Sequence, residues 1–167
     1  MADDTLLPED IVALARRVVE ENAAAGRTVA LAESCTGGLV AAALTEIAGS
    51  SAVLDRSFVT YSNEAKMAEL DVSTDIIEAF GAVSIACVWA MAKGALAASE
   101  ADVAVAISGI AGPGGGTEEK PVGTVVFAKA ERDAEGDPMA ERKQFGDTSR
   151  SEVRRQATLC ALQLLLP

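Results

Sequence analysis

The alternation of short strand-like segments with longer helical segments is the feature that most constrains the fold of this chain. Residues 27–34 (RTVALAES) and 101–109 (ADVAVAISG) are short apolar runs bounded by polar residues, as in buried strands. Residues 8–26 and 149–166 instead repeat apolar side chains every three or four positions, as in amphipathic helices. Strands that alternate with helices predict an α/β fold, a single three-layer α/β/α domain whose sheet is mostly parallel.

The remaining segments extend this pattern and add a hairpin. Residues 54–62 form a further predicted strand, and residues 123–132 and 139–146 are two predicted strands joined by the polar turn DAEGDP. Because a hairpin is antiparallel, the sheet is predicted to be mixed. We find no internal repeat, linker or low-complexity segment, and we expect one domain over residues 1–167. The other predicted helices are residues 36–50, 63–70, 73–81 and 84–100.

The charge of the chain narrows the class of protein. It has 25 acidic and 14 basic residues, no histidine, and a formal net charge of −11. Nucleic acids and anionic membrane surfaces attract basic proteins, so we expect neither as a partner. An anionic substrate would have to be held by a local group of Lys or Arg. Aromatic residues make up only 4% of the chain, so the core must be built from Ala, Val, Leu and Ile.

The cysteines and the N-terminal segment indicate a cytoplasmic protein. Cys35, Cys87 and Cys160 are widely spaced and odd in number, which favours reduced thiols over disulfides. The first ten residues are acidic and lack a basic start followed by an apolar stretch, so we expect no signal peptide. The most apolar region, residues 83–98, is interrupted by a lysine and a glycine and is too short to span a bilayer.

The turn AESCTGG follows a predicted strand and opens a predicted helix, and it contains two candidate nucleophiles, Ser34 and Cys35. Ligands of α/β folds bind at the carboxyl ends of strands, where the N–H groups of a helix N-terminus can bind an anion or an oxyanion. The alternative is that Ser34 and Thr36 only cap the helix, with Gly37 and Gly38 permitting a tight turn. Because the chain has no histidine, a serine nucleophile would need a different base.

The segment FVTYSNEAK, residues 58–66, supplies the candidate base, Lys66. A lysine on a short helix is commonly a solvated charge. A lysine that is desolvated beside a serine has a lowered pKa, however, and acts as a general base in Ser–Lys hydrolases. We expect both burial and neighbouring arginine cations to lower the pKa of Lys66. Tyr61 is the candidate to relay or orient the proton.

The segment SGIAGPGGGTEEKPVGT, residues 108–124, is rich in glycine but matches neither common phosphate motif. No G-K-[ST] follows its glycines, and Thr117 occupies the last position of a G-x-G-x-x-G pattern. We expect its backbone N–H groups to approach a ligand, and the alternative is a flexible connector. The residues expected to contact substrate are Ser108, Gly112, Gly114, Gly115 and Gly116.

Three arginines, Arg150, Arg154 and Arg155, crowd the start of the last predicted helix. Cations near a helix N-terminus oppose the helix dipole unless an anion is bound there, which indicates a phosphate site. The alternative is salt bridging to Glu152 and neighbouring acids. With no histidine and no cysteine pair, we expect no metal site and no cofactor.

In this order along the chain, these motifs resemble the C-terminal domain family of the competence/damage-inducible protein CinA, from about Ile11 to about Leu165. The motifs are AESCTGG, AGSS, FVTYSNEAK, GAVS, SGIAGPGGGTEEKPVGT and VRRQA. Stand-alone members of this family are nicotinamide-nucleotide amidohydrolases. The resemblance implies hydrolysis of the carboxamide of nicotinamide mononucleotide, which gives nicotinate mononucleotide and ammonia.

The resemblance also implies a serine–lysine arrangement. The matching positions are Ser34, Lys66, Tyr61 and Arg154. Two departures from the family pattern stand out. Ile85 follows GAVS where an acidic residue is usual, and GDTSRSEVR is slightly longer than usual, which leaves the choice of phosphate-binding arginine open.

Together these observations predict an amidohydrolase. Ser34 would attack the carboxamide after Lys66 removes its proton, the N–H groups of residues 35–38 would stabilise the oxyanion, and Arg150 or Arg154 would hold the phosphate. The alternative is a regulatory module, linked to competence or DNA damage, that binds a nucleotide without turning it over. From the small size and the apolar helices we expect a homo-oligomer.

Overall fold

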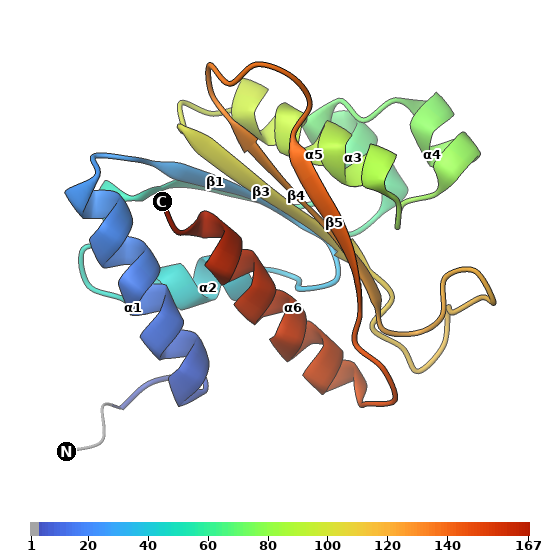
Figure 1. Ribbon diagram of the computed structural model, residues 1–167, viewed down its shortest axis with the longest axis horizontal. Coiled ribbons are helices and arrows are strands. Elements are labelled where there is room, and N and C mark those ends of the chain that lie inside the picture. Colours follow the sequence, from blue (N-terminus) through green and yellow to red (C-terminus); the bar gives the residue numbers. More distant parts are fainter. Residues whose placement is uncertain (1–3) are drawn as a thin grey trace.

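A five-stranded sheet forms the centre of the computed structural model, which describes residues 4–167 (Figure 1). Residues 1–3, the start of the acidic N-terminal segment, lie outside the described residues. The strand order is β2-β1-β3-β4-β5. The strands are β1 (Val29–Glu33), β2 (Leu54–Val59), β3 (Val103–Gly109), β4 (Thr124–Glu131) and β5 (Met139–Gln144).

The directions of the strands confirm the predicted mixed sheet. β1 lies between β2 and β3 and is parallel to both. β4 pairs antiparallel with β3, and β5 pairs antiparallel with β4, so the predicted hairpin is also confirmed. The sheet therefore has a parallel half, which carries the strand before Ser34, and an antiparallel half.

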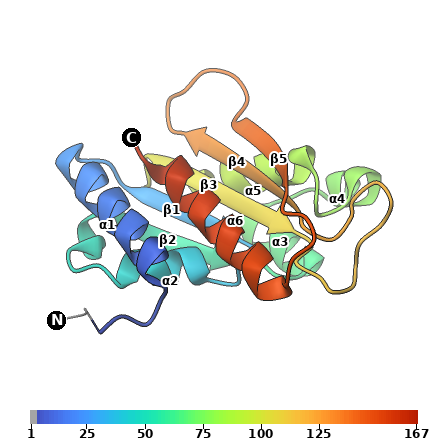
Figure 2. The ribbon, with the colours of Figure 1, turned by 60° about the horizontal axis from the view of Figure 1, so that its bottom comes forward.

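Helices cover both faces of the sheet and complete the three layers (Figures 1 and 2). The predicted helix 36–50 is shorter than expected: it begins at Leu39 and ends at Thr45, and a short 3-10 turn (Ser50–Ala52) follows. On one face lie α1 (Glu9–Ala24), α2 (Leu39–Thr45) and α6 (Arg150–Leu165), and on the other α3 (Asn63–Leu70), α4 (Thr74–Phe80) and α5 (Ile85–Ala97).

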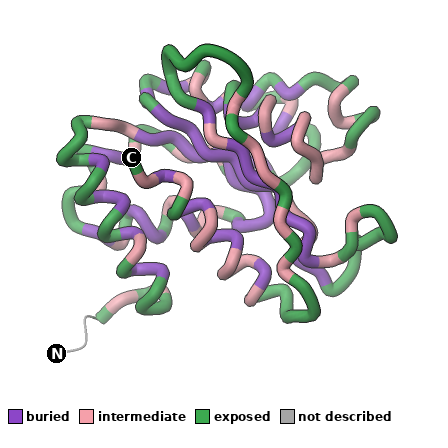
Figure 3. Tube along the Cα trace, in the orientation of Figure 1, coloured by how far each residue is buried: buried purple, intermediate pink, exposed green. Residues whose placement is uncertain are grey.

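The core is built from small aliphatic side chains, as the composition predicts. Figure 3 shows the buried residues concentrated along the central strands and the inward sides of the helices. All five residues of β1 are buried, because helices pack on both of its faces. One of the largest fully buried side chains is not apolar, however: Lys66 is as completely buried as core residues such as Phe127. In the described part of the chain, no helix is long and apolar enough to cross a membrane.

The strand order marks one position of the sheet for ligand binding. From β1 the chain passes through α2 to β2 on one side, and it then returns through α3, α4 and α5 to β3 on the other side. Such a reversal opens a crevice outside the carboxyl ends of the two neighbouring parallel strands. Ser34 directly follows β1, and Ser108 lies near the end of β3.

Candidate active site

Ser34 lies at the carboxyl end of β1, where the strand turns sharply into α2. Its backbone N–H donates to the Ile107 carbonyl at 3.0 Å, which continues the pairing of β1 with β3 by one residue. The turn closes with the Gly37 N–H on the Ser34 carbonyl, and Gly38 has a φ of +100°. A side chain at that φ would be strained, which explains the glycine. Ser34 is 7% exposed and is therefore buried, although it lines a pocket.

Lys66 extends from α3 to the Ser34 hydroxyl. Ser62 caps this helix by accepting from the Ala65 N–H, so the helix begins one residue later, at Asn63, as predicted. The Lys66 Nζ lies 3.0 Å from Ser34 Oγ and donates to the Thr60 carbonyl at 2.8 Å. The sequence pattern placed both residues after strand ends, and the structure brings them into direct contact.

The environment of Lys66 disfavours its charged form. The residue is 1% exposed, and burial lowers the pKa of its ammonium group below the ordinary value. No acidic side chain of residues 4–167 forms an ion pair with it. The arginine contribution expected from the sequence is not found: the other groups that affect the pKa of Lys66 are Cys87 and Cys35, and they raise it less than burial lowers it.

Cys35, the rival nucleophile, is held as a thiol. It is 5% exposed, and burial raises its pKa to about 11. The Cys35 Sγ also packs closely against Gly109, since a Cβ added to this glycine would lie 3.0 Å from the sulfur. Because the thiolate is the nucleophilic form of cysteine, this environment favours Ser34 over Cys35.

Tyr61, the residue predicted to relay or orient the proton, contacts Lys66 through its backbone and not through its hydroxyl. Its ring is 61% exposed, and its hydroxyl accepts from the Arg150 guanidinium at 3.1 Å. The carbonyl of Tyr61, rather than its hydroxyl, faces the base, and it accepts from the Lys66 Nζ at 3.4 Å. The structure therefore joins Tyr61 to Lys66 through the backbone and to Arg150 through the side chain.

A pocket of about 290 Å³ opens beside Ser34 at the crevice between β1 and β3. It brings together the predicted residues Ser34, Cys35, Tyr61, Lys66, Ser108, Gly112, Gly114, Gly115 and Arg150. Residues that sequence reasoning missed also line it: Asn63, Ala82, Val83, Gly109, Ile110 and Ala111.

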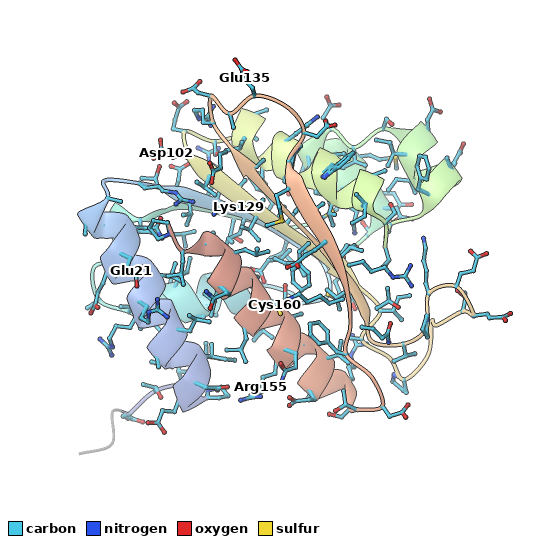
Figure 4. All side chains as sticks on the ribbon, in the orientation of Figure 1. Glu21, Asp102, Lys129, Glu135, Arg155 and Cys160 are labelled. Atoms are coloured by element: carbon cyan, nitrogen blue, oxygen red, sulfur yellow. The ribbon has the colours of Figure 1, made fainter. Side chains whose placement is uncertain are left out.

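A larger cavity, of about 530 Å³, lies at the opposite end of the sheet, beneath the loop of the β4–β5 hairpin. It contains neither a serine nor a cysteine. Its two lysines, Lys93 and Lys129, lie 3.4 and 3.5 Å from the carboxylates of Asp137 and Glu131. Figure 4 shows Lys129 near the upper end of the sheet. Of these two cavities, only the smaller one contains a candidate nucleophile.

The three arginines at the start of α6 separate into three environments. Arg150 lines the pocket and donates to the Gly112 carbonyl at 2.7 Å. Arg154 is directed to the turn instead, where it donates to the carbonyls of Cys35 and Thr36. Arg155 pairs with Asp10 and Glu152, as the salt-bridge alternative predicted, and it is not in the lining of the pocket. Figure 4 shows Arg155 beside the first part of α6.

Four other predicted substrate contacts are not in the lining of the pocket: Thr36, Gly37, Gly38 and Gly116. Thr36 is fully buried, and its hydroxyl donates to Glu33 at 2.6 Å. Gly116 packs against its own loop, since a Cβ there would lie 2.7 Å from the Val122 backbone nitrogen. These residues therefore shape the turn after Ser34 and the glycine-rich loop without lining the pocket.

Glu33 is a further residue that sequence reasoning missed. It ends β1, is fully buried, and accepts three hydrogen bonds, from the Thr36 hydroxyl and the Val40 and Ala41 N–H groups. One signal was available in the sequence: an acidic residue at the end of an apolar buried strand, directly before a helix N-terminus. No group of three or more potential metal ligands occurs among residues 4–167.

Comparison with known proteins agrees with this geometry. Residues 11–167 match the family model of the CinA C-terminal domain. A relative from Escherichia coli K12, named nicotinamide-nucleotide amidohydrolase PncC, is 54% identical over 157 residues, which is 93% of each chain. One of the same name from Enterobacter agglomerans is 56% identical over 144 residues, which cover 86% of this chain and 85% of the relative.

Longer relatives and solved structures place the chain in the same family. A putative competence-damage inducible protein from Symbiobacterium thermophilum is 46% identical over 98% of this chain, which is 38% of its own length. The crystal structure of a competence/damage inducible protein from Agrobacterium tumefaciens has a TM-score of 0.92 and 51% identity, and 96% of each chain is covered. This chain therefore belongs to the CinA C-terminal domain family.

Proposed function

We propose that this protein is a nicotinamide-nucleotide amidohydrolase that converts nicotinamide mononucleotide to nicotinate mononucleotide and ammonia, with Ser34 as nucleophile and Lys66 as base. The observation that carries the proposal is the contact of 3.0 Å between the Lys66 Nζ and Ser34 Oγ, made by a lysine that is 1% exposed. Relatives that match 93% of the chain are named for this activity.

Acylation begins when neutral Lys66 takes the proton of the Ser34 hydroxyl. The Oγ then forms a bond to the carboxamide carbon, and the carbonyl oxygen becomes an oxyanion. In the turn, Cys35 lines the pocket and its N–H group has no acceptor in another described residue, so it is available to that oxygen. The carbon–nitrogen bond breaks as the Lys66 ammonium gives its proton to the leaving nitrogen, which departs as ammonia.

Deacylation repeats these steps with water. Lys66, neutral again, takes a proton from a water molecule, and the hydroxide attacks the ester carbon. The bond between the carbon and Ser34 Oγ breaks, and Lys66 returns the proton to Ser34. The same two residues therefore serve both halves of the reaction, and no histidine is needed.

The phosphate of the nucleotide is held at the other end of the pocket, by Arg150 and the N-terminus of α6. Arg150 is oriented there by the Gly112 carbonyl and the Tyr61 hydroxyl. Its position at the first residue of α6 lets the helix dipole and the guanidinium act on the same anion. Of the two arginines left open by the sequence, Arg150 is our choice, because it lines the pocket and Arg154 does not.

We also place the protein in the cytoplasm and expect it to act as a homo-oligomer. All three cysteines are free thiols, which suits a reducing compartment. Val59 and Phe80 are large apolar side chains that are 47% and 57% exposed, and a second copy would cover them. Light scattering coupled to size-exclusion chromatography gives the mass of the assembly, and a monomer at micromolar concentration would contradict this part.

The function is tested by ammonia release from nicotinamide mononucleotide. Ser34→Ala should lose turnover by several orders of magnitude yet still bind the product, since a hydroxyl contributes little to ground-state affinity. Cys35→Ala is the matched control and should keep substantial activity. A regulatory module that only binds nucleotide would release no ammonia with the wild type. Activity in Ser34→Ala, with none in Cys35→Ala, would contradict the serine mechanism.

The same assay tests the proposed binding of the phosphate by Arg150. Arg150→Gln should raise KM by about 10- to 100-fold and change kcat less, because a charged hydrogen bond remote from the reacting carbon contributes mainly to binding. Free nicotinamide should be a poor substrate for the same reason. Equal turnover of nicotinamide and its mononucleotide would show that no phosphate site exists.

A further inference from the structure

Two charged side chains hold the turn between Ser34 and α2 from opposite sides, and neither contacts the pocket. We propose that these side chains, Glu33 and Arg154, are positioning residues that fix the turn, and with it the N–H group of Cys35, for the oxyanion. This inference rests on the proposed function for its kinetic part, and it assigns a role to two residues outside the Ser34–Lys66 pair.

Glu33 holds the turn from the side of the sheet. One carboxylate oxygen accepts from the Thr36 hydroxyl at 2.6 Å and from the Val40 N–H at 3.0 Å, and the other accepts from the Ala41 N–H at 3.1 Å. The carboxylate therefore joins the end of β1, the middle of the turn and the first turn of α2. A negative charge is stabilised there by the N-terminus of the helix, so it needs no cation.

Arg154 holds the same turn from α6. Its Nε donates to the Cys35 carbonyl at 3.1 Å and its Nη2 to the Thr36 carbonyl at 3.3 Å. Because a peptide unit is planar, these two contacts fix the peptide planes on both sides of Thr36. They therefore limit the rotation of the neighbouring residue Cys35, which lines the pocket.

Thr36 is where the two contacts meet. Its hydroxyl is held by Glu33 and its carbonyl by Arg154, and the residue is fully buried. Neither charged side chain forms an ion pair with any other of residues 4–167. Both side chains instead contact the turn between Ser34 and α2. Oxyanion donors act only when they are oriented before the reaction, which is the task that such a two-sided support performs.

The kinetic test compares Arg154→Gln and Glu33→Gln with Arg155→Gln. Gln in place of Glu33 is nearly isosteric but opposes the Ala41 N–H with its own N–H groups, and Gln in place of Arg154 cannot reach both carbonyls. We expect kcat to fall by about 10- to 100-fold in the first two variants, with KM changed less than about threefold. Arg155→Gln, on the same helix but paired with Asp10 and Glu152, should keep wild-type kcat.

A transition-state probe separates orientation from general damage to the fold. In an aldehyde analogue of the substrate, Ser34 Oγ adds to the aldehyde carbon, its proton passes to Lys66, and the former carbonyl oxygen takes the place of the oxyanion. Affinity for this analogue should fall by the same factor as kcat, while affinity for nicotinate mononucleotide stays unchanged. Equal losses for both ligands, or an unchanged kcat, would overturn the proposal.

A measurement that needs no activity keeps the proposal distinct from the proposed function. Hydrogen–deuterium exchange of residues 34–41 in the unliganded protein should be faster in Arg154→Gln and Glu33→Gln than in the wild type and in Arg155→Gln. If the wild type releases no ammonia, the proposed function fails and this exchange experiment still tests the support of the turn. Exchange equal to that of the wild type in both variants would show that neither residue holds it.

Discussion

At the scale of single residues, the unusual feature of this protein is Lys66, which is more completely buried than any other lysine or arginine in the described chain. Its Nζ is satisfied by the Thr60 carbonyl and the Ser34 hydroxyl, and no carboxylate balances it. Such an arrangement opposes stability as long as the lysine is charged. A catalytic role explains why the fold contains it.

Because buried Lys66 opposes stability in its charged form, the stability of the protein should depend on pH. Burial lowers the pKa of Lys66 in the folded protein, whereas in the unfolded chain it is about 10.4. Between these two pKa values the unfolded chain binds more protons, so the free energy of unfolding of the wild type rises with pH, by up to about 1.4 kcal/mol per pH unit. Lys66→Met lacks this dependence, and its stability relative to the wild type should therefore decline as pH rises toward 10.4.

Urea unfolding at several pH values measures this difference. Lys93→Met is the control, because Lys93 is on the surface of α5 and its side chain is 57% exposed. Its stability difference from the wild type should stay constant over the same range. A constant difference for Lys66→Met as well would mean that burial does not affect the protonation of Lys66.

Which site residues could be predicted depended on the length and direction of their side chains. The pairing of Ser34 with Lys66 was accessible, because the absence of histidine left few bases for a serine. The roles of the arginines were not. Arg150 and Arg154 are one helical turn apart, and only the docking of α6, with Val153 and Ala157 buried, decides that one reaches the pocket and the other the turn.

At the scale of secondary structure, the packing of α3 on α5 determines where Lys66 lies. The two helices meet where the last residue of α3, Leu70, contacts Gly94. A Cβ at Gly94 would lie 2.8 Å from the carbonyl carbon of Leu70 and closer still to its oxygen. The glycine therefore permits the approach that brings the Lys66 side chain to Ser34.

Gly94→Ala should lower both stability and kcat. In an exposed helix this substitution would stabilise by about 1 kcal/mol, but here overpacking against backbone should cost about 1–3 kcal/mol. Because α3 must move, the distance from Lys66 to Ser34 changes, and we expect kcat to fall about 10-fold or more. Thermal unfolding and ammonia release provide the two readouts.

Ala90→Gly on the same helix is the control for stability alone. It should cost about 1 kcal/mol through helix propensity and leave kcat unchanged. If Gly94→Ala were as active and as stable as the wild type, the packing of α3 on α5 would not determine the position of the base.

Ser84 and Ser62 cap α5 and α3, and each accepts from the N–H group three residues later. The start of α2 was predicted three residues too early, since the segment TGG has helix-like neighbours but forms the turn between Ser34 and α2. The local sequence pattern could not distinguish the turn from the start of the helix, because the turn is held by Glu33 and by Arg154, which is distant in sequence.

At the scale of the whole molecule, the α/β class and the hairpin followed from the order of segments, but the location of the site did not. Sequence order does not show that β1 lies between β2 and β3, and it is this order that opens the crevice beside Ser34. Strand order is decided by pairing between segments far apart in the chain, such as Ala30 with Ala104. Only the structure shows it.

The net charge of −11 predicts a stability that depends on salt. With 25 acidic and 14 basic residues, repulsion among surface carboxylates opposes the compact state. Raising sodium chloride from about 10 to about 150 mM shortens the screening length from about 30 to about 8 Å, so the melting temperature should rise by a few degrees. Sodium fluoride at the same ionic strength is the control for ion-specific effects. A melting temperature that falls with both salts would mean that attractive ion pairs dominate the surface.

The activity of Lys66→Arg tests the central claim, that Lys66 acts as a base for Ser34, most directly. Arginine keeps the positive charge and much of the length, but its guanidinium does not lose a proton at usable pH. Ammonia release by Lys66→Arg, measured from pH 6 to pH 10 beside the wild type and Lys66→Met, should be as low as in Lys66→Met at every pH. The wild-type kcat/KM should rise with pH through one ionisation, that of Lys66. Near-normal turnover in Lys66→Arg would show that a positive charge is sufficient there, and would contradict the account.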